Sequence, residues 1–237
     1  MTKKSMIRSL QLVFAFSLGA ISILSCKGGK NNQNTMGADT VLVKGLYIHS
    51  DKIDSLRDCA DTTVVYFVKD QTGKLGTRYD SLPGIQHTNE AVLVELKGVV
   101  VKTTNDSTAK TLPRTLNVYS INRIERKNFQ NVCIQYDFWA LGSEPNWNLQ
   151  ISQSENLISF EDFNTQKGYR FNYKTPRINS DTTSWTYESR NREERSNIRV
   201  IIRKQDCNDT MSDHVYKYSA EVSINGRNYK GCAVAWK

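Results

Sequence analysis

Residues 218–232 read Tyr-Ser-Ala-Glu-Val-Ser-Ile-Asn-Gly-Arg-Asn-Tyr-Lys-Gly-Cys, and this stretch decides the fold class. Apolar and polar residues alternate on both sides of Asn225-Gly226, which is the strongest short signal for a two-residue β-hairpin. The sequence therefore predicts an antiparallel hairpin at the end of the chain. We expect its strands to face each other through Tyr216, Tyr218, Ala220, Val222 and Ile224 on one side and Tyr229, Cys232 and Val234 on the other.

Short strands separated by turn residues recur upstream of this hairpin, about ten residues apart. Gly142, Asn164 and Pro176 mark turns between several of them. With the two hairpin strands included, the expected strands are 133–140, 147–152, 157–163, 169–173, 184–188, 198–204, 215–224 and 229–236. Eight short strands predict an all-β domain over 128–237, either an antiparallel β-barrel or a sandwich.

The first half of the chain predicts a smaller β domain, which we assign to 40–127. One short helix is expected between Gly73 and Leu82, where Pro83 and Gly84 follow. Apolar or alternating runs predict strands on both sides of it, at 41–48, 64–68, 91–101 and 116–124, with Gly98 as a bulge or bend. Short strands on both sides of a single helix are typical of a small OB-like barrel, and the alternative is an open sheet.

The N-terminus carries a targeting signal. Three cations among the first eight residues precede an apolar run over 10–24, and Ser25 stands before Cys26. The run is short for a transmembrane helix, and the whole segment resembles a bacterial lipoprotein signal peptide. We therefore expect a signal peptide at 1–25 and a lipid anchor on Cys26, which holds the protein on the bilayer. The alternative is an uncleaved signal anchor.

Residues 26–39 form a polar stretch without apolar periodicity, so we expect a flexible tether between the lipid and the folded protein. No acidic residue follows the cysteine directly, which favours the periplasmic face of the outer membrane. Loss of the three cations of 1–25 lowers the formal net charge from +8 to +5, and this mild excess indicates solubility more than a partner. Without an arginine-rich block or zinc-finger spacing, nucleic acid is not an expected partner.

Four cysteines follow the acylated one, and an even number in an oxidising compartment indicates disulfides. Three connectivities are possible. Counting outward from the hairpin turn, Cys232 lies near residues 217–219, within reach of Cys207 on an adjacent strand or turn. We therefore expect Cys207–Cys232 and, by exclusion, Cys59–Cys133. The alternative for the second pair is one or two free, buried thiols.

Two blocks in the second half carry a family resemblance. Residues 140–149 read Ala-Leu-Gly-Ser-Glu-Pro-Asn-Trp-Asn-Leu, residues 207–212 read Cys-Asn-Asp-Thr-Met-Ser, and Gly231-Cys232 follows near the end. These blocks resemble a family of uncharacterised bacterial envelope lipoproteins, and the likeness covers about 130–235. The resemblance implies an envelope location and no established activity. Relatives in that family include fusions to lysozyme-inhibitor-like barrels, although no inhibitory loop can be matched here.

The same blocks supply the candidate ligand residues. Glu144, Trp147, Asp209 and Met211 are expected to form a binding site on the rim of the second domain. The alternative is structural. Trp147 then plugs one end of a barrel as a core aromatic, Glu144 caps a turn, and Met211 starts a turn after the disulfide.

No catalytic residue, metal site or cofactor is expected from the sequence. The histidines at 49, 87 and 214 lack the spacing of metal ligands, and no P-loop, dinucleotide fingerprint or Gly-x-Ser-x-Gly motif is present. The run from Arg190 to Arg195, with Glu193-Glu194 inside it, reads as a solvated loop of mixed charge. A pair of carboxylates brought together by the fold stays open as a route to glycosidase chemistry.

A modification signal recurs along the chain. Aspartate is followed by serine or threonine, and then by a small or aliphatic residue or threonine, at Asp39, Asp54, Asp61, Asp80, Asp106, Asp181 and Asp209. The pattern resembles the O-glycosylation sequon of some Gram-negative envelopes, and we expect Thr40, Ser107 and Thr182 to be used. The alternative is that such pairs are simply common in turns between strands.

The sequence therefore predicts a membrane-anchored envelope lipoprotein with a non-enzymatic binding or envelope-maintenance role, whose partner is an envelope protein or polymer. One alternative is an inhibitor of a secreted lytic enzyme such as lysozyme. Another is a hydrolase acting on envelope polymers. A shallow barrel braced by disulfides favours binding, whereas a cleft with two carboxylates, or with one carboxylate and His214, favours the hydrolase.

Overall fold

The computed structural model describes residues 39–84, 89–104, 106–209 and 214–236. The expected signal peptide, Cys26 and nearly all of the tether lie outside the described residues. The described chain is all-β, as expected, with two short helices. Neither helix of this part is long and apolar enough to cross a membrane.

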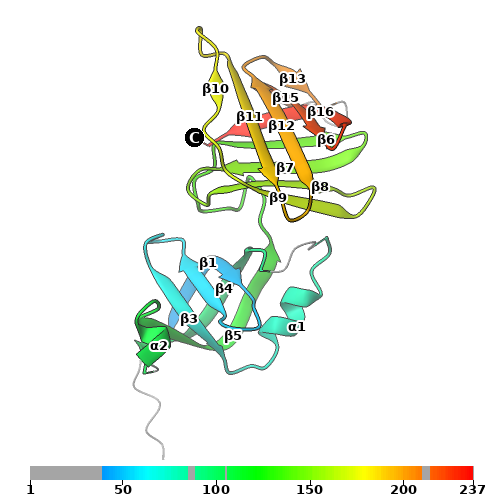
Figure 1. Ribbon diagram of the computed structural model, residues 1–237. Coiled ribbons are helices and arrows are strands. Elements are labelled where there is room, and N and C mark those ends of the chain that lie inside the picture. Colours follow the sequence, from blue (N-terminus) through cyan, green and yellow to red (C-terminus); the bar gives the residue numbers. More distant parts are fainter. Residues whose placement is uncertain (1–38, 85–88, 105, 210–213, 237) are drawn as a thin grey trace, which may run out of the picture. The chain divides into compact units, whose positions relative to one another are not determined.

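Five strands close a barrel in the first half of the chain (Figure 1). They are β1 Val41–Ile48, β2 Ser55–Asp58, β3 Val65–Asp70, β4 Val92–Lys102 and β5 Arg114–Arg126. Their order around the barrel is β1-β2-β3-β5-β4, with β3 and β5 parallel. This closed barrel is the expected OB-like architecture and excludes the open sheet. Strand β2 was missed because Ser-Leu-Arg-Asp has a single apolar residue, the fully buried Leu56.

The expected helix between β3 and β4 is α1, Leu75–Asp80. Asp70 fixes its start, since its carboxylate accepts the Leu75 N–H at 2.8 Å. Leu75 and Tyr79 pack into the barrel core, and the Tyr79 hydroxyl donates to the carbonyl oxygen of Glu90 at 2.6 Å. A second short helix, α2 Asp106–Ala109, lies between β4 and β5 and was not expected.

Gly98 is the expected irregularity of the long strand β4. The register against β5 shifts between Lys97 and Gly98. A Cβ at Gly98 would lie 2.3 Å from the carbonyl oxygen of Asn117, so the two strands can approach this closely only at a glycine.

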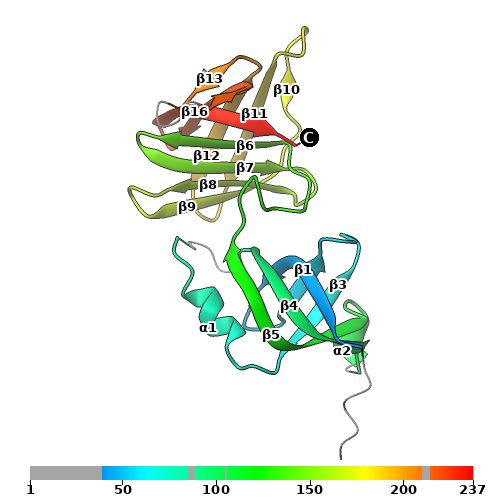
Figure 2. The same cartoon turned by 180° about the vertical axis from the view of Figure 1, so that it is seen from behind.

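The second half forms one curled, antiparallel sheet of nine strands (Figure 2). Its strands are β6 Phe138–Ser143, β7 Asn146–Ser152, β8 Leu157–Asp162, β9 Lys167–Asn172, β10 Arg177–Ile178, β11 Ser184–Asn191, β12 Ser196–Arg203, β15 Tyr218–Ile224 and β16 Arg227–Ala235. They follow the order β10-β11-β12-β15-β16-β6-β7-β8-β9. The sheet is a half-barrel, which settles the choice between barrel and sandwich.

The expected strands of this half are present, with a few differences. The first begins at Phe138 instead of Cys133, and β10 is an additional short edge strand. The expected strand 215–224 is broken at Lys217 into β14, Val215–Tyr216, and β15. The short strand β14 pairs with β13, Cys207–Asn208, in a separate two-stranded sheet.

The terminal hairpin turns at Asn225-Gly226, as predicted, with φ angles of 49° and 82°. Both positive values are what the tight hairpin turn requires. Val222 stands opposite Tyr229, so Tyr229 faces the expected residues of β15. The expectation for Cys232 and Val234 was wrong. They lie an odd number of residues after Tyr229, and successive side chains of a strand point to opposite faces.

Both expected disulfides are present. Cys59 is bonded to Cys133 with a Cα–Cα distance of 5.4 Å, and Cys207 to Cys232 with one of 5.5 Å. Cys232 stands opposite Ser219 in the β15–β16 ladder, within the expected interval.

The division into a domain over 40–127 and another over 128–237 stays a prediction. The barrel strands fall in the first range and the sheet strands in the second. The described residues nevertheless group as one compact unit. One buried apolar cluster contains Leu46 of the barrel and Trp139 of the sheet.

Candidate ligand-binding site

The last strand of the curled sheet, β9, approaches β11 near the opposite end of the sheet, and the two do not pair as strands. Side chains bridge this seam. Ser189 Oγ donates a 2.7 Å hydrogen bond to the carbonyl oxygen of Asn172, and Asn191 Nδ2 donates one of 3.0 Å to the carbonyl oxygen of Arg170. The seam is therefore closed by side-chain to backbone bonds in place of a backbone ladder.

An aromatic pair supports the seam from the core side. Tyr173, just after β9, packs edge to face against Tyr187 of β11, with ring centroids 6.1 Å apart. Burial raises the pKa of both phenols, and the Asp137 carboxylate raises them further. Both groups are therefore neutral at physiological pH, and the charge of the outer surface comes from other residues.

Asn191 also shapes the turn that follows β11. Its side-chain oxygen accepts the backbone N–H groups of Glu193 and Glu194 at 3.0 and 3.1 Å. An asparagine that hydrogen-bonds the backbone two residues ahead is a common turn-forming device. The Asn191 side chain therefore closes the seam through its bond to Arg170 and also fixes the turn that contains Arg192.

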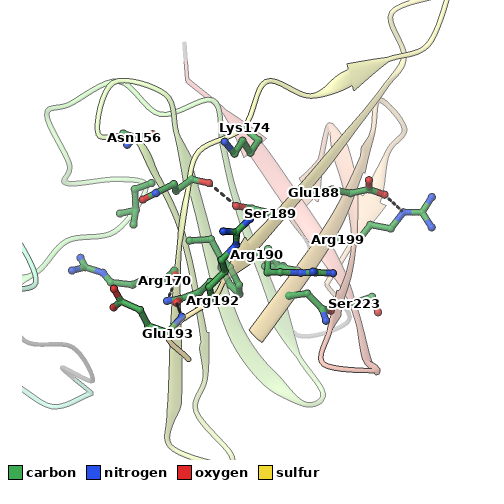
Figure 3. Close-up of a pocket in the computed structure, with 16 residues that line it drawn as sticks. Asn156, Arg170, Lys174, Glu188, Ser189, Arg190, Arg192, Glu193, Arg199 and Ser223 are labelled. Atoms are coloured by element: carbon green, nitrogen blue, oxygen red, sulfur yellow. Dashed lines mark hydrogen bonds and ion pairs between the residues drawn. The ribbon is translucent and has the colours of Figure 1, made fainter. Parts of the chain in front are cut away.

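A groove of about 1380 Å³ opens along the seam (Figure 3). Strands β9, β11, β12 and β15 and the turn before β8 contribute to it. Figure 3 shows Arg170, Arg192 and Glu193 gathered at one end and Lys174 toward the other. The remaining lining residues are Asn156, Leu157, Phe171, Asn172, Glu188, Ser189, Arg190, Asn191, Asn197, Ile198, Arg199 and Ser223.

The charge of the groove is unbalanced. Five cationic and two acidic side chains line it. Glu188 Oε1 lies 3.4 Å from Arg199 Nε and 3.0 Å from Arg177 Nη2, so this carboxylate is already shared between two guanidinium groups. The other four cations of the groove form no ion pair with a carboxylate of the described residues.

The sequence placed three of these residues in a plain solvated loop, and this interpretation was incomplete. Arg190, Arg192 and Glu193 line the groove, whereas Arg195 does not. The alternation of side chains along the strand could have predicted that these residues face outward. Tyr187 is buried in β11, so Glu188 and Arg190 point to the outer face. The approach of β9, which brings Arg170 to the same place, depends on how far the sheet curls.

The expected rim site is only partly assembled. Glu144 and Asp209 line one hollow of about 520 Å³, together with Glu221 and Lys230. Ser143 Oγ donates to the carbonyl oxygen of Asp209 at 3.2 Å and ties the two segments together. Met211, the fourth candidate, lies outside the described residues.

Trp147 corrects the expected rim site. It is 1% exposed and packs against Phe160 and Tyr229, with centroid distances of 5.7 and 6.2 Å. Its indole N–H donates to the carbonyl oxygen of Lys230 at 3.3 Å. Trp147 is a core aromatic, as the structural alternative held, and it offers no surface to a ligand.

The described histidines stand away from the groove. His214 packs edge to face on Tyr216, with ring centroids 4.6 Å apart. His49 Nδ1 lies 2.8 Å from Asp54 Oδ1, and the same carboxylate accepts the Tyr47 hydroxyl at 2.7 Å. Within the described ranges, no group of three or more His, Cys, Asp or Glu side chains is gathered for a metal ion. His87 lies outside those ranges.

The expected O-glycosylation sites are exposed in the structure. Thr40, Ser107 and Thr182 are all solvent-exposed. At Thr182, which has a φ of 56°, the neighbouring Asp181 is engaged by Thr183. That hydrogen bond lowers the pKa of Asp181. Accessibility is necessary for modification, and the modification itself stays a prediction.

Comparison with protein-family models, with curated proteins and with solved structures found no match to this chain. The resemblance to envelope lipoproteins therefore rests on the sequence blocks at 140–149 and 207–212.

Proposed function

We propose that this protein is a lipid-anchored binding module of the cell envelope and that the groove at the β9–β11 seam holds its ligand. The observation that carries the proposal is the groove itself, with a volume of about 1380 Å³ and four cations without an ion-paired carboxylate among the described residues. The lipid anchor on Cys26, expected from the sequence, would keep this surface at the membrane.

The position of the lining side chains supports a binding role. Arg170, Arg190 and Arg199 lie on strands of one hydrogen-bonded sheet, and Arg192 lies in a turn fixed by Asn191. Because the framework is already ordered, little backbone entropy is lost when a ligand binds, which favours affinity.

Binding to native envelope material tests the proposal. The full-length lipoprotein in detergent micelles is mixed with lipid-free envelope fragments and sedimented, beside R190A/R192A and the control K97A/K102A, which removes two exposed barrel cations outside the groove. We expect the wild type and the control to sediment with the fragments and R190A/R192A to stay in solution. Equal sedimentation of all three proteins would show that the groove does not bind the envelope material.

The groove also contains two carboxylates, Glu188 and Glu193, and this observation keeps the hydrolase as a second candidate. Release of reducing ends from envelope polysaccharide, abolished in E188Q or E193Q, would establish it. We favour binding because Glu188 is half-exposed and already shared between Arg177 and Arg199. Capture of a lytic enzyme in the sedimentation experiment would instead favour the inhibitor.

A further inference from the structure

We propose that the groove binds a linear polysaccharide that carries carboxylate groups. This inference rests on the proposed function and names the ligand class of the same site. Three properties of the groove support this ligand, namely its unpaired cations, its length across the sheet and the chemistry of its neutral lining.

The cations set the sign of the ligand. Arg170, Lys174, Arg190 and Arg192 form no ion pair with a described carboxylate, and Arg170 Nε is buried without a hydrogen-bond partner. The planar guanidinium group matches a carboxylate through two parallel hydrogen bonds. Three of the four cations are arginines, so a ligand with repeated carboxylates satisfies several of them at once.

The length of the groove favours a chain over a single anion. The lining runs from β9 through β11 and β12 to Ser223 of β15. Neighbouring hydrogen-bonded strands lie about 4.8 Å apart, so the two spacings from β11 to β15 correspond to about 10 Å, and the unpaired strand β9 extends the groove beyond them. Cross-strand pairing places Glu188 beside Arg199 and Arg199 beside Ser223, so polar side chains form a continuous row over that distance.

The neutral lining favours a carbohydrate over a protein. It contains four asparagines and two serines. Asn191 and Ser189 hold the seam, and the other four side chains can both donate and accept hydrogen bonds, which suits a hydroxyl-rich ligand. Its three apolar residues are Leu157, Phe171 and Ile198, and the last two are buried. Protein interfaces usually place aromatic or aliphatic anchors at their centre, and single-stranded nucleic acid stacks on exposed aromatics. This groove offers neither.

Titration with a defined polymer tests the ligand class. The full-length lipoprotein in detergent micelles is titrated calorimetrically with polygalacturonate and with its fully methyl-esterified form, which has the same backbone without the charge. We expect binding of the first and none of the second, and weakening with added salt, because exposed charges are screened. Equal binding of both polymers would overturn the assignment. Binding of a third titrant, dextran sulfate, without binding of polygalacturonate would also overturn it.

Variants connect binding to the groove. R190A/R192A should bind polygalacturonate at least roughly tenfold more weakly, since each charged hydrogen bond contributes about 1.5–3 kcal/mol, and 1.4 kcal/mol is a factor of ten. R190K/R192K keeps the charge but loses the paired geometry, so we expect an intermediate affinity. K97A/K102A should match the wild type. Wild-type affinity in R190A/R192A, with thermal unfolding showing a folded protein, refutes the assignment.

The two proposals fail separately. If envelope fragments are retained through Arg190 and Arg192 but polygalacturonate does not bind, the ligand class is wrong and the binding function stands. If neither is retained, both proposals fall.

Discussion

Ser189 Oγ donates a hydrogen bond of 2.7 Å to the carbonyl oxygen of Asn172, although β11 and β9, which end in this region, are not paired as strands. Asn191 makes the companion bond to Arg170 at 3.0 Å. Two side chains therefore hold together the ends of a sheet that elsewhere is held by backbone ladders. The position of the cations in the groove depends on the spacing that these two bonds set.

Removal of both seam bonds should loosen β9. In S189A/N191A we expect the free energy of unfolding to fall by at least about 1–3 kcal/mol, at about 0.5–1.5 kcal/mol for each seam hydrogen bond, because N191A also removes its two hydrogen bonds to the turn. Hydrogen exchange should accelerate in β9 more than in β7. The control is S223A, which removes a hydroxyl of the same groove that makes no seam bond. Unchanged exchange in β9 would show that the aromatic pair beneath suffices.

Gly231 should tolerate no side chain. A Cβ there would lie 2.1 Å from the carbonyl oxygen of Leu141 and 2.8 Å from Cζ2 of Trp147. We expect G231A to lower the free energy of unfolding by about 1–3 kcal/mol, because overpacking a closely packed site forces neighbours from their positions. Urea denaturation measures this, with N228A as a control at an exposed position of the same strand. Wild-type stability in G231A would mean that Leu141 and Trp147 can move enough to make room for a side chain.

Some features of the fold and the groove could be predicted from the sequence, and others could not. Alternation and the Asn225-Gly226 turn predicted the strands of the sheet, since hairpin geometry is local. Ser55–Asp58 was missed because its burial comes from the barrel and not from its composition. The groove was missed for a related reason. Arg170 and Arg190 are twenty residues apart, and only the curl of the whole sheet brings their strands together. Trp147, proposed as ligand or core, was decided by its packing.

Glu161 should make stability depend on pH. Burial raises its pKa above 4.5, and Glu90 raises it further, while Arg126, which bonds both carboxylates, opposes the shift. A carboxyl group with a raised pKa in the folded state contributes stability below its unfolded pKa, and this is lost as pH rises through the folded value. The difference in the free energy of unfolding, E161Q minus wild type, should therefore increase as the pH rises above 4.5.

Urea denaturation over a pH series measures that difference, with E221Q as the matched control, because Glu221 is a more exposed carboxylate paired with one arginine. Parallel pH profiles for E161Q and the wild type would contradict the assigned role of Glu161.

Glycosylation at Thr40, Ser107 and Thr182 is expected from the aspartate-containing triplets and is compatible with the exposure of all three. Protein purified from its native envelope should be heavier than the lipidated polypeptide, and T40A/S107A/T182A should lose most of that excess. Added glycans at these positions would be surface groups that increase solubility. An intact mass equal to that of the lipidated polypeptide would remove the hypothesis.

Crosslinking from inside the groove tests the central claim most directly. A photoreactive benzoyl-phenylalanine replaces Asn197, an exposed lining residue of the groove, or Asn122, an exposed residue of the barrel, in full-length protein in living cells. We predict a crosslinked, high-mass, carbohydrate-containing product from position 197 and none from position 122, and we predict that R190A/R192A abolishes this product. A product from position 122 alone, or one from position 197 that persists in R190A/R192A, would contradict the account.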